Sequence, residues 1–187
     1  FLLRQNQLNS KDLDYVVFYE KPHLKLHRIL NYQKKNYISN FKFQEDFFNT
    51  WNKKKLFTRD YISDFFKIPK KKVLFYEHHF SHAASSYYCS DFKESDLLTV
   101  DGVGEWCTTS FGTVDNDNLK RSHSIDFPNS IGLLYSAFTE FLGFEVNEGE
   151  FKVMGMAPYG KPKYLEKINK LFKSNDINFE LDLSYFN

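Results

Sequence analysis

The chain has few of the residues that cross-link or anchor a protein. Cys89 and Cys107 are its two thiols in 187 residues, and their spacing fits neither a zinc knuckle nor a disulfide framework, so we expect a reducing cytoplasm. No apolar run approaches the roughly 20 residues that cross a bilayer, and no charged-then-apolar signal segment opens the chain. Excess charge is also lacking: 25 basic and 24 acidic side chains leave a net charge of +1. We therefore expect neither a membrane nor a nucleic acid as partner.

Aromatic residues are abundant instead, with 21 Phe, 12 Tyr and 2 Trp. They could form a stacking surface for bases or sugars. They are, however, spread along apolar faces rather than clustered with basic residues, and 21 of the 25 basic residues are lysine. A coding sequence rich in A and T explains this composition better. The run Lys70-Lys71-Lys72 is interpreted as a solvated loop rather than a phosphate site.

The hydrophobic pattern predicts a mixture of strands and helices, and hence an α/β fold. We expect a buried strand at 13–19 and further strands at 73–76, 97–100, 106–114, 119–125 and 179–186. We expect helices at 24–31, 83–88, 131–142 and 163–172, and one or two amphipathic helices between residue 39 and Phe66. The residues 115–118 predict a hairpin turn, and Asn129 or Ser130 a helix N-cap.

Three of the six histidines lie within Glu77-His78-His79-Phe80-Ser81-His82. On a helix, His78 and His82 would share one face. Imidazole and carboxylate are common partners for transition metals. We expect the strand that ends at Asp101 to lie next to the strand that leads into the histidines, so these three residues predict a metal site. His79 could replace His78 as a ligand. Alternatively, the histidines could be hydrogen-bonded at a helix start and bind nothing.

Three glycine-containing segments could approach a phosphate. The first contains Asp101, Gly102 and Gly104, but it lacks the third glycine of a dinucleotide fingerprint, and a simple turn is equally compatible. In the second, Ser130, Ile131 and Gly132 begin a predicted helix, where free N–H groups favour anions. The third segment contains Glu150 and Lys152 near Gly149. These two polar residues fit either a nucleotide site or a surface turn.

Four motifs in this order resemble the carbamoyltransferases of the nodulation-protein and antibiotic-tailoring type. They are EHHFSHAAS at 77–85, DGVGEW at 101–106, FPNSIGLLYS at 127–136 and GEFKVMGMAPYG at 149–160. The resemblance spans roughly residues 13 to 164. More distantly, the two histidines and Gly149-Glu150 are similar to the proteins that transfer threonylcarbamoyl to tRNA adenosine, which share an actin-like, ribonuclease-H-like fold.

The resemblance implies an actin-like domain with a mixed sheet and flanking helices. Such enzymes make carbamoyl adenylate from carbamoyl phosphate and ATP, then pass the carbamoyl group to a hydroxyl of a sugar or antibiotic-like acceptor. It implies that His78, His82 and Asp101 bind a divalent metal, with iron first and zinc or manganese as alternatives. The adenylate would be contacted by a larger set: Asp101, Gly102, Gly104, Ser130, Ile131, Gly132, Glu150 and Lys152.

The chain begins at Phe1 without a methionine, and we expect residues 1–187 to be part of one longer transfer domain, inactive alone. The resemblance places the catalytic base before Phe1, so no base is assigned. Homodimerisation is left open. Two rival interpretations remain: a non-catalytic nucleotide- or metal-binding module of actin-like fold, and a metal-dependent hydrolase.

Overall fold

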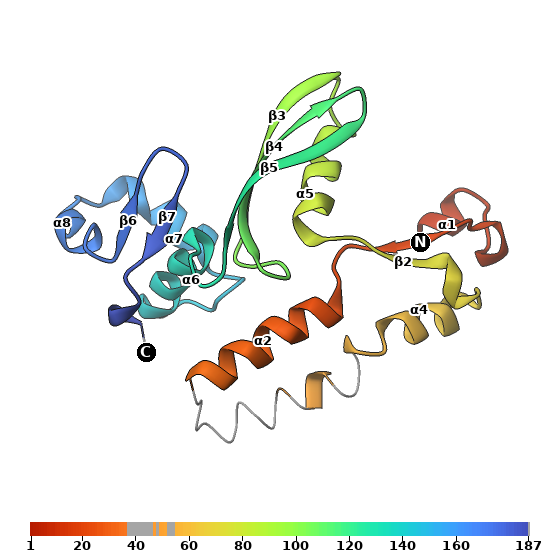
Figure 1. Cartoon of the computed structure of the whole chain (residues 1–187), viewed down its shortest axis with the longest axis horizontal. Helices are drawn as coiled ribbons and strands as arrows, with labels where there is room; N and C mark the ends of the chain where they lie inside the picture. The colour runs from red at the N-terminus through yellow and green to blue at the C-terminus, as the bar shows by residue number, and fades with distance from the viewer. Residues whose placement is uncertain (37–46, 48, 52–54, 187) are drawn as a thin grey trace. The chain divides into compact units, whose positions relative to one another are not determined.

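The computed structural model describes residues 1–36, 47, 49–51 and 55–186, which form two compact units (Figure 1). Unit 1 comprises Phe1–Ser81 and unit 2 comprises His82–Asn187. The division falls inside one continuous helix, α5 (His78–Tyr87). Across the described ranges, no helix is both long and apolar enough to span a membrane.

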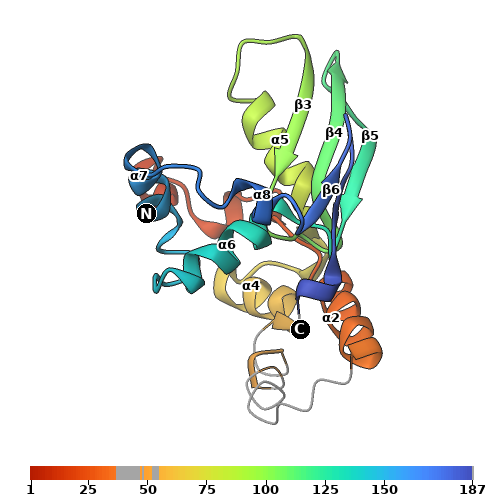
Figure 2. The same ribbon diagram turned by 90° about the vertical axis from the view of Figure 1, so that its left-hand side faces the viewer.

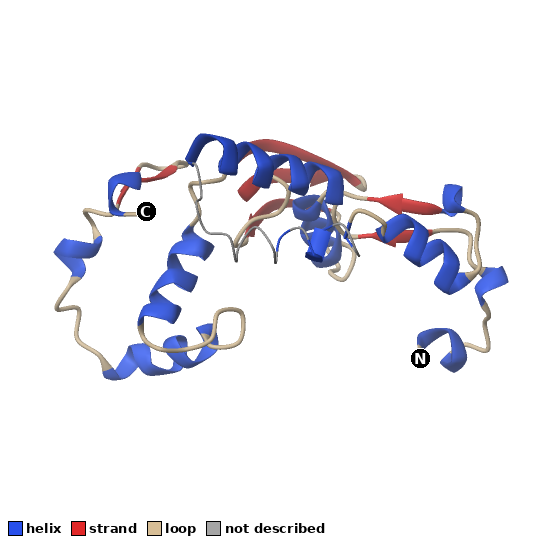
Figure 3. Ribbon diagram, turned by 90° about the horizontal axis from the view of Figure 1, so that it is seen from below, coloured by secondary structure: helices blue, strands red, loops and turns tan. Residues whose placement is uncertain are grey.

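Unit 1 is built around a parallel pair of short strands, seen side by side as arrows in Figure 3. Strand β1 (Val16–Phe18) pairs with β2 (Val73–Phe75) so that Val16 lies opposite Val73. Among its described residues the unit also contains α1 (Leu2–Gln5), η1 (Ser10–Asp12), α2 (Pro22–Asn36), α4 (Thr58–Phe66) and η3 (Lys70–Lys72).

The connection from α4 to β2 is fixed by local hydrogen bonds. Lys67 ends α4 in the left-handed conformation, with φ 53°, and the Ser63 hydroxyl donates to the carbonyl of Ile68 at 2.6 Å. Lys72 Nζ then donates to the Leu13 carbonyl just before β1, also at 2.6 Å. These contacts hold buried Val73 in register with β1, and the chain then continues from β2 into α5.

Unit 2 contains a three-stranded antiparallel sheet of order β3-β4-β5, and α5 runs alongside it (Figures 1 and 2). Its strands are β3 (Glu94–Val100), β4 (Cys107–Asp115) and β5 (Asn118–Asp126). Asn116 and Asp117 form the two-residue β4–β5 turn with φ values of 46° and 63°, as expected for a type I′ hairpin.

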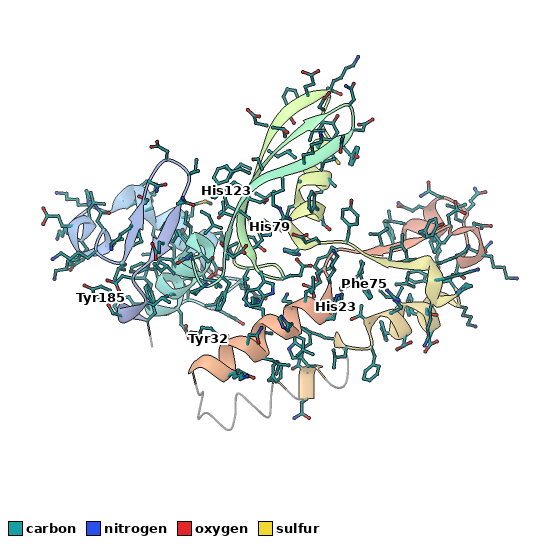
Figure 4. The ribbon with its side chains drawn as sticks, viewed as in Figure 1. His23, Tyr32, Phe75, His79, His123 and Tyr185 are labelled. Atoms are coloured by element: carbon teal, nitrogen blue, oxygen red, sulfur yellow. The ribbon has the colours of Figure 1, made fainter. Side chains whose placement is uncertain are left out.

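The helices α6 (Ile131–Phe141), α7 (Glu150–Met156) and α8 (Leu165–Ile168) follow. A second antiparallel hairpin closes the unit: β6 (Phe172–Ser174) and β7 (Phe179–Leu181), with η4 (Ala157–Tyr159) before it and η5 (Leu183–Tyr185) after it. Two polar contacts attach this hairpin. His123 Nε2, labelled in Figure 4, lies 2.9 Å from Asn178 Oδ1, and the Leu181 N–H donates to Asn129 Oδ1 at 2.9 Å.

Most predicted elements are confirmed, with shifted bounds. The strand predicted at 13–19 is shorter and less buried than expected, since Val17 is 58% exposed. The helix predicted at 24–31 extends over all of α2, whereas the one predicted at 163–172 shrinks to α8. Strand β6 and helix α7 were not predicted. The last strand, predicted at 179–186, ends at Leu181. Predicted helical residues at 39–46, 48 and 52–54 lie outside the described residues.

The α/β class is confirmed, with sheets flanked by helices. In the described part of the chain, however, the strands form three separate ladders and not one mixed sheet. The strand ending at Phe75 pairs with β1, and the strand ending at Val100 pairs with β4. The expectation that these two strands are sheet neighbours is therefore wrong for the described ladders. That residues 1–187 belong to one domain stays a prediction.

Gly112 gives a test of the β4–β5 register. It lies at a β-bulge, and a Cβ there would overlap the Lys120 carbonyl oxygen and lie 3.2 Å from its carbon. We expect Gly112→Ala to destabilise unit 2 by about 1–3 kcal/mol in urea unfolding, the usual cost of adding a carbon to a packed site. Gly155→Ala is the matched control, because nothing lies within 4 Å of that Cβ. Equal stability of the two variants would contradict the observed strand contact.

Candidate metal centre

Helix α5 carries the histidine cluster and has one buried stripe. His79, Ala83 and Tyr87 are four residues apart and are all at most 6% exposed, so they form the packed face of the helix. His78 and His82 lie on the neighbouring stripe, one turn apart. Spacing alone therefore separates a histidine that packs inward from two that can reach a ligand.

Contacts within unit 1 fix the first turn of α5. The Ser81 hydroxyl lies 3.2 Å from the Tyr19 carbonyl and 3.1 Å from the Glu77 carbonyl, within hydrogen-bond reach of both. The rings of Tyr19 and His78 are 5.6 Å apart. The end of β1 thus holds the turn that presents His78.

Contacts within unit 2 fix the other end of the helix. The Tyr87 hydroxyl donates to the Lys93 carbonyl at 3.1 Å and lies 3.3 Å from Asp117 Oδ1. Burial, followed by the Asp117 carboxylate, raises the pKa of the Tyr87 hydroxyl. Tyr88 donates to the Asp117 carbonyl at 3.3 Å. The helix is therefore attached to the β4–β5 turn of the sheet that leads to Asp101.

Asp101 follows β3 directly, and its carboxylate approaches α5. Its N–H donates to the Thr108 carbonyl at 2.9 Å, which continues the β3–β4 ladder by one residue. His82 Nε2 and Asp101 Oδ2 are 3.8 Å apart, and their side chains are 48% and 32% exposed. The pair is thus accessible from solvent and lies within unit 2.

His78, His82 and Asp101 each offer one ligand atom, and these atoms all lie within 4.8 Å of one another. The continuous backbone of α5 carries His78 to within one turn of His82. Two imidazoles and one carboxylate suit a divalent transition metal and leave coordination positions for other ligands. That these three residues bind a metal stays a prediction. The group contains His78 and not His79. His79, which is labelled in Figure 4, is 1% exposed.

The first and second glycine-containing segments, which contain Gly102 and Ser130, contact one another. The Ser130 hydroxyl caps α6 by accepting from the Leu133 N–H at 2.9 Å, and it donates to the Gly102 carbonyl at 2.6 Å. Gly104 is buried, and its N–H donates to the Cys107 carbonyl at 2.9 Å. The structure thus brings Gly102 and Ser130 together beside Asp101. Their contact with an adenylate stays a prediction.

Glu150, in the third segment, organises its own loop. Its carboxylate accepts from the Asn147 N–H at 3.0 Å, the Ser136 hydroxyl at 2.9 Å and the Gly149 N–H at 3.3 Å. These bonds, the Asn147 N–H foremost, lower the pKa of the Glu150 carboxyl. Lys152 is exposed and lies 5.8 Å from the ring centroids of Phe144 and Phe151.

Sequence reasoning missed two residues that support these segments. Thr108 is fully buried, and its hydroxyl donates to the carbonyl of Asn129 at 2.5 Å, one residue before the α6 cap. Ser136 lies on α6, and its hydroxyl donates to the Glu150 carboxylate. Thr108 had no signal beyond strand alternation. Ser136 lies within the FPNSIGLLYS motif, but its partner is 14 residues away.

The sequence profile described as "Carbamoyltransferase N-terminus" matches residues 1–187. The chain belongs to this family. The predicted resemblance is therefore confirmed at the level of the family.

Individual relatives agree with this membership. An uncharacterized protein of Synechocystis sp. is 39% identical over 100% of this chain and 32% of its own length. The nodulation protein NolNO of Sinorhizobium fredii is 34% identical over 51% of this chain and 14% of its own length. The nodulation protein NolO of Bradyrhizobium diazoefficiens is 32% identical over 53% of this chain and 18% of its own length. The chain thus spans about a third or less of the length of the curated relatives it matches.

The hydrogen bonds of Glu150 predict a pH-dependent contribution to stability. Because the folded-state pKa lies below the unfolded value, the stabilisation is fully present above the unfolded pKa of about 4.3 and is lost as pH falls through the folded pKa. We expect Glu150→Gln to lower the thermal midpoint at pH 7, with the difference from the parent protein shrinking below about pH 4.

Glu148→Gln is the control, since Glu148 is an exposed neighbour in the same loop. Hydrogen exchange gives a second readout: the Asn147 and Gly149 amides should exchange faster in Glu150→Gln alone. A destabilisation that persists unchanged at pH 3 would show that the carboxylate charge is not responsible.

Proposed function

We propose that this chain forms part of the transfer domain of an O-carbamoyltransferase, with an actin-like fold. Its substrates would be carbamoyl phosphate, ATP and a small-molecule hydroxyl acceptor. The observation that carries the proposal is the cluster of His78, His82 and Asp101, in a chain that matches the carbamoyltransferase N-terminus family over its whole length. Membership of the carbamoyltransferase family fits a small-molecule acceptor.

His78, His82 and Asp101 would hold a divalent metal, iron first and zinc or manganese as alternatives. When bound, such an ion would supply Lewis-acid polarisation of a carbonyl or phosphoryl oxygen. The three residues would supply two neutral nitrogen ligands and one negative oxygen ligand. The exposure of His82 and Asp101 leaves room for a donor molecule beside them.

The proposed reaction passes a carbamoyl group from carbamoyl adenylate to the acceptor. The acceptor oxygen forms a bond to the carbamoyl carbon, and the bond from that carbon to the adenylate phosphate oxygen breaks. AMP leaves with the electron pair of that bond, and a general base takes the hydroxyl proton. No oxidant or reductant is required.

The start of α6 supports binding of the adenylate phosphate. The first N–H groups of a helix have no intrahelical acceptor and attract anions, and in α6 these belong to Ile131 and Gly132. Ser130 already caps Leu133, so it would hold the helix start in shape. Exposed Lys152 could approach the phosphate from α7, whereas Glu150 would keep its loop in place.

Removal of single ligands tests the metal assignment. In the complete gene product, we expect His78→Ala, His82→Ala and Asp101→Ala each to lower Fe²⁺ or Zn²⁺ affinity by a factor of about 100 or more, because each variant loses one direct ligand. His123→Ala is the matched control, since His123 faces Asn178 in the hairpin contact. Affinity is measured by competition with a chromogenic chelator. Unchanged affinity in His82→Ala would refute the ligand set.

Activity is tested by supplying the complete gene product with carbamoyl phosphate, ATP and a panel of sugars and hydroxylated antibiotics. Release of AMP and pyrophosphate that needs both carbamoyl phosphate and an acceptor is the expected result. Metal binding without such release would favour a non-catalytic binding module. Cleavage of phosphoesters or peptides instead would favour a metal-dependent hydrolase.

A further inference from the structure

The start of α6 is in direct backbone contact with the residue pair Asp101–Gly102. Ser130 is fully buried, and its hydroxyl has two partners: it accepts from the Leu133 N–H and donates to the Gly102 carbonyl at 2.6 Å. The same oxygen lies 3.4 Å from the Asp101 carbonyl. One hydroxyl therefore caps the helix and holds the loop that follows β3.

Gly132 makes this close approach possible. A Cβ at Gly132 would lie 2.6 Å from the Asp101 carbonyl oxygen, 2.7 Å from the Asp101 carbonyl carbon and 2.8 Å from the Gly102 nitrogen. All three atoms are backbone, so no side-chain rotation can relieve the overlap. Any other residue at this position must push the Asp101 peptide away by several tenths of an ångström to reach the 3.4 Å of ordinary contact.

Thr108 fixes the backbone on the amino side of Asp101. Its carbonyl accepts the Asp101 N–H at 2.9 Å, and its hydroxyl donates to the Asn129 carbonyl at 2.5 Å. The backbone of Asp101 is thus held on its amino side by Thr108 and on its carboxyl side by the start of α6. Because Thr108 also holds Asn129, the two supports form a closed ring.

We propose that Ser130 and Gly132 are positioning residues that set the place of the Asp101 carboxylate relative to His82. The inference rests on the metal site of the proposed function. As positioning residues, Ser130 and Gly132 act on the metal through Asp101 and do not contact it. Ligand groups must be held within about 0.5 Å of their working geometry. The displacement that a side chain at Gly132 requires is of that size, so the substitution acts on the metal through Asp101.

The test uses Co²⁺ as probe, because its visible absorption reports both binding and coordination geometry. In the complete gene product, Gly132→Ala is expected to weaken Co²⁺ binding by about 10- to 100-fold, the usual effect of removing support from a ligand, and to change the visible spectrum of the bound ion. Gly155→Ala, a glycine-to-alanine change in open space, is expected to leave both unchanged.

A double-mutant comparison separates positioning from a general loss of structure. If Gly132 acts through Asp101, then Gly132→Ala adds no further loss in a protein that already carries Asp101→Ala. Co²⁺ affinity of Gly132→Ala equal to that of the parent protein would overturn the inference. So would losses that multiply in the double variant.

Ser130→Ala provides a second variant that adds no bulk, for use where Gly132→Ala does not fold. It is expected to weaken Co²⁺ binding severalfold and again to add nothing in the Asp101→Ala background. Parent-like binding by folded Ser130→Ala would count against the role of the hydroxyl. If His82→Ala leaves Co²⁺ binding unchanged, the metal site itself is wrong; if only the Ser130 and Gly132 variants bind normally, the positioning role alone fails.

Discussion

The backbone of Asp101 is held on both sides by contacts with other backbone groups. The Thr108 carbonyl of β4 accepts the Asp101 N–H on one side, and on the other side a helix start that only glycine can bring so close lies against the Asp101–Gly102 peptide. Backbone contacts of this kind do not adjust as side-chain contacts can, because packed interiors resist small displacements. The position of the Asp101 carboxylate beside His82 follows from this packing, and so does the geometry of the candidate metal centre.

Local patterns carried much of the fold prediction. The β4–β5 hairpin was predictable because alternating residues flank a turn whose Asn116 and Asp117 tolerate positive φ. Helix α6 was predictable from its apolar content and from Ser130 as cap. The hairpin β6–β7 was not, because its strands are three residues each and its attachment depends on the distant side chains of His123 and Asn129.

The candidate site was predicted in part for a similar reason. The spacing of His78 and His82 is local to one helix, so the sequence defined their common face. Asp101 could be placed because a strand leads into it. Roles that depend on partners far along the chain could not be found: Ser130 bonds across 28 residues to Gly102, and Thr108 across 21 to Asn129. Sequence reasoning therefore predicted Ser130 as a helix cap and as a ligand contact, and it missed the bond to Gly102.

Three of the motifs that carry the family resemblance meet in contacts described above. His82 of the histidine motif approaches Asp101, which opens the DGVGEW motif. Gly102 of that motif accepts from Ser130 of the FPNSIGLLYS motif, and Gly132 lies against the same peptide. Residues separated by some 50 positions thus form one continuous structure, in which a helix start supports a loop and the loop presents a carboxylate to a histidine. These three motifs are therefore linked by direct contacts around Asp101, although they lie far apart in the sequence.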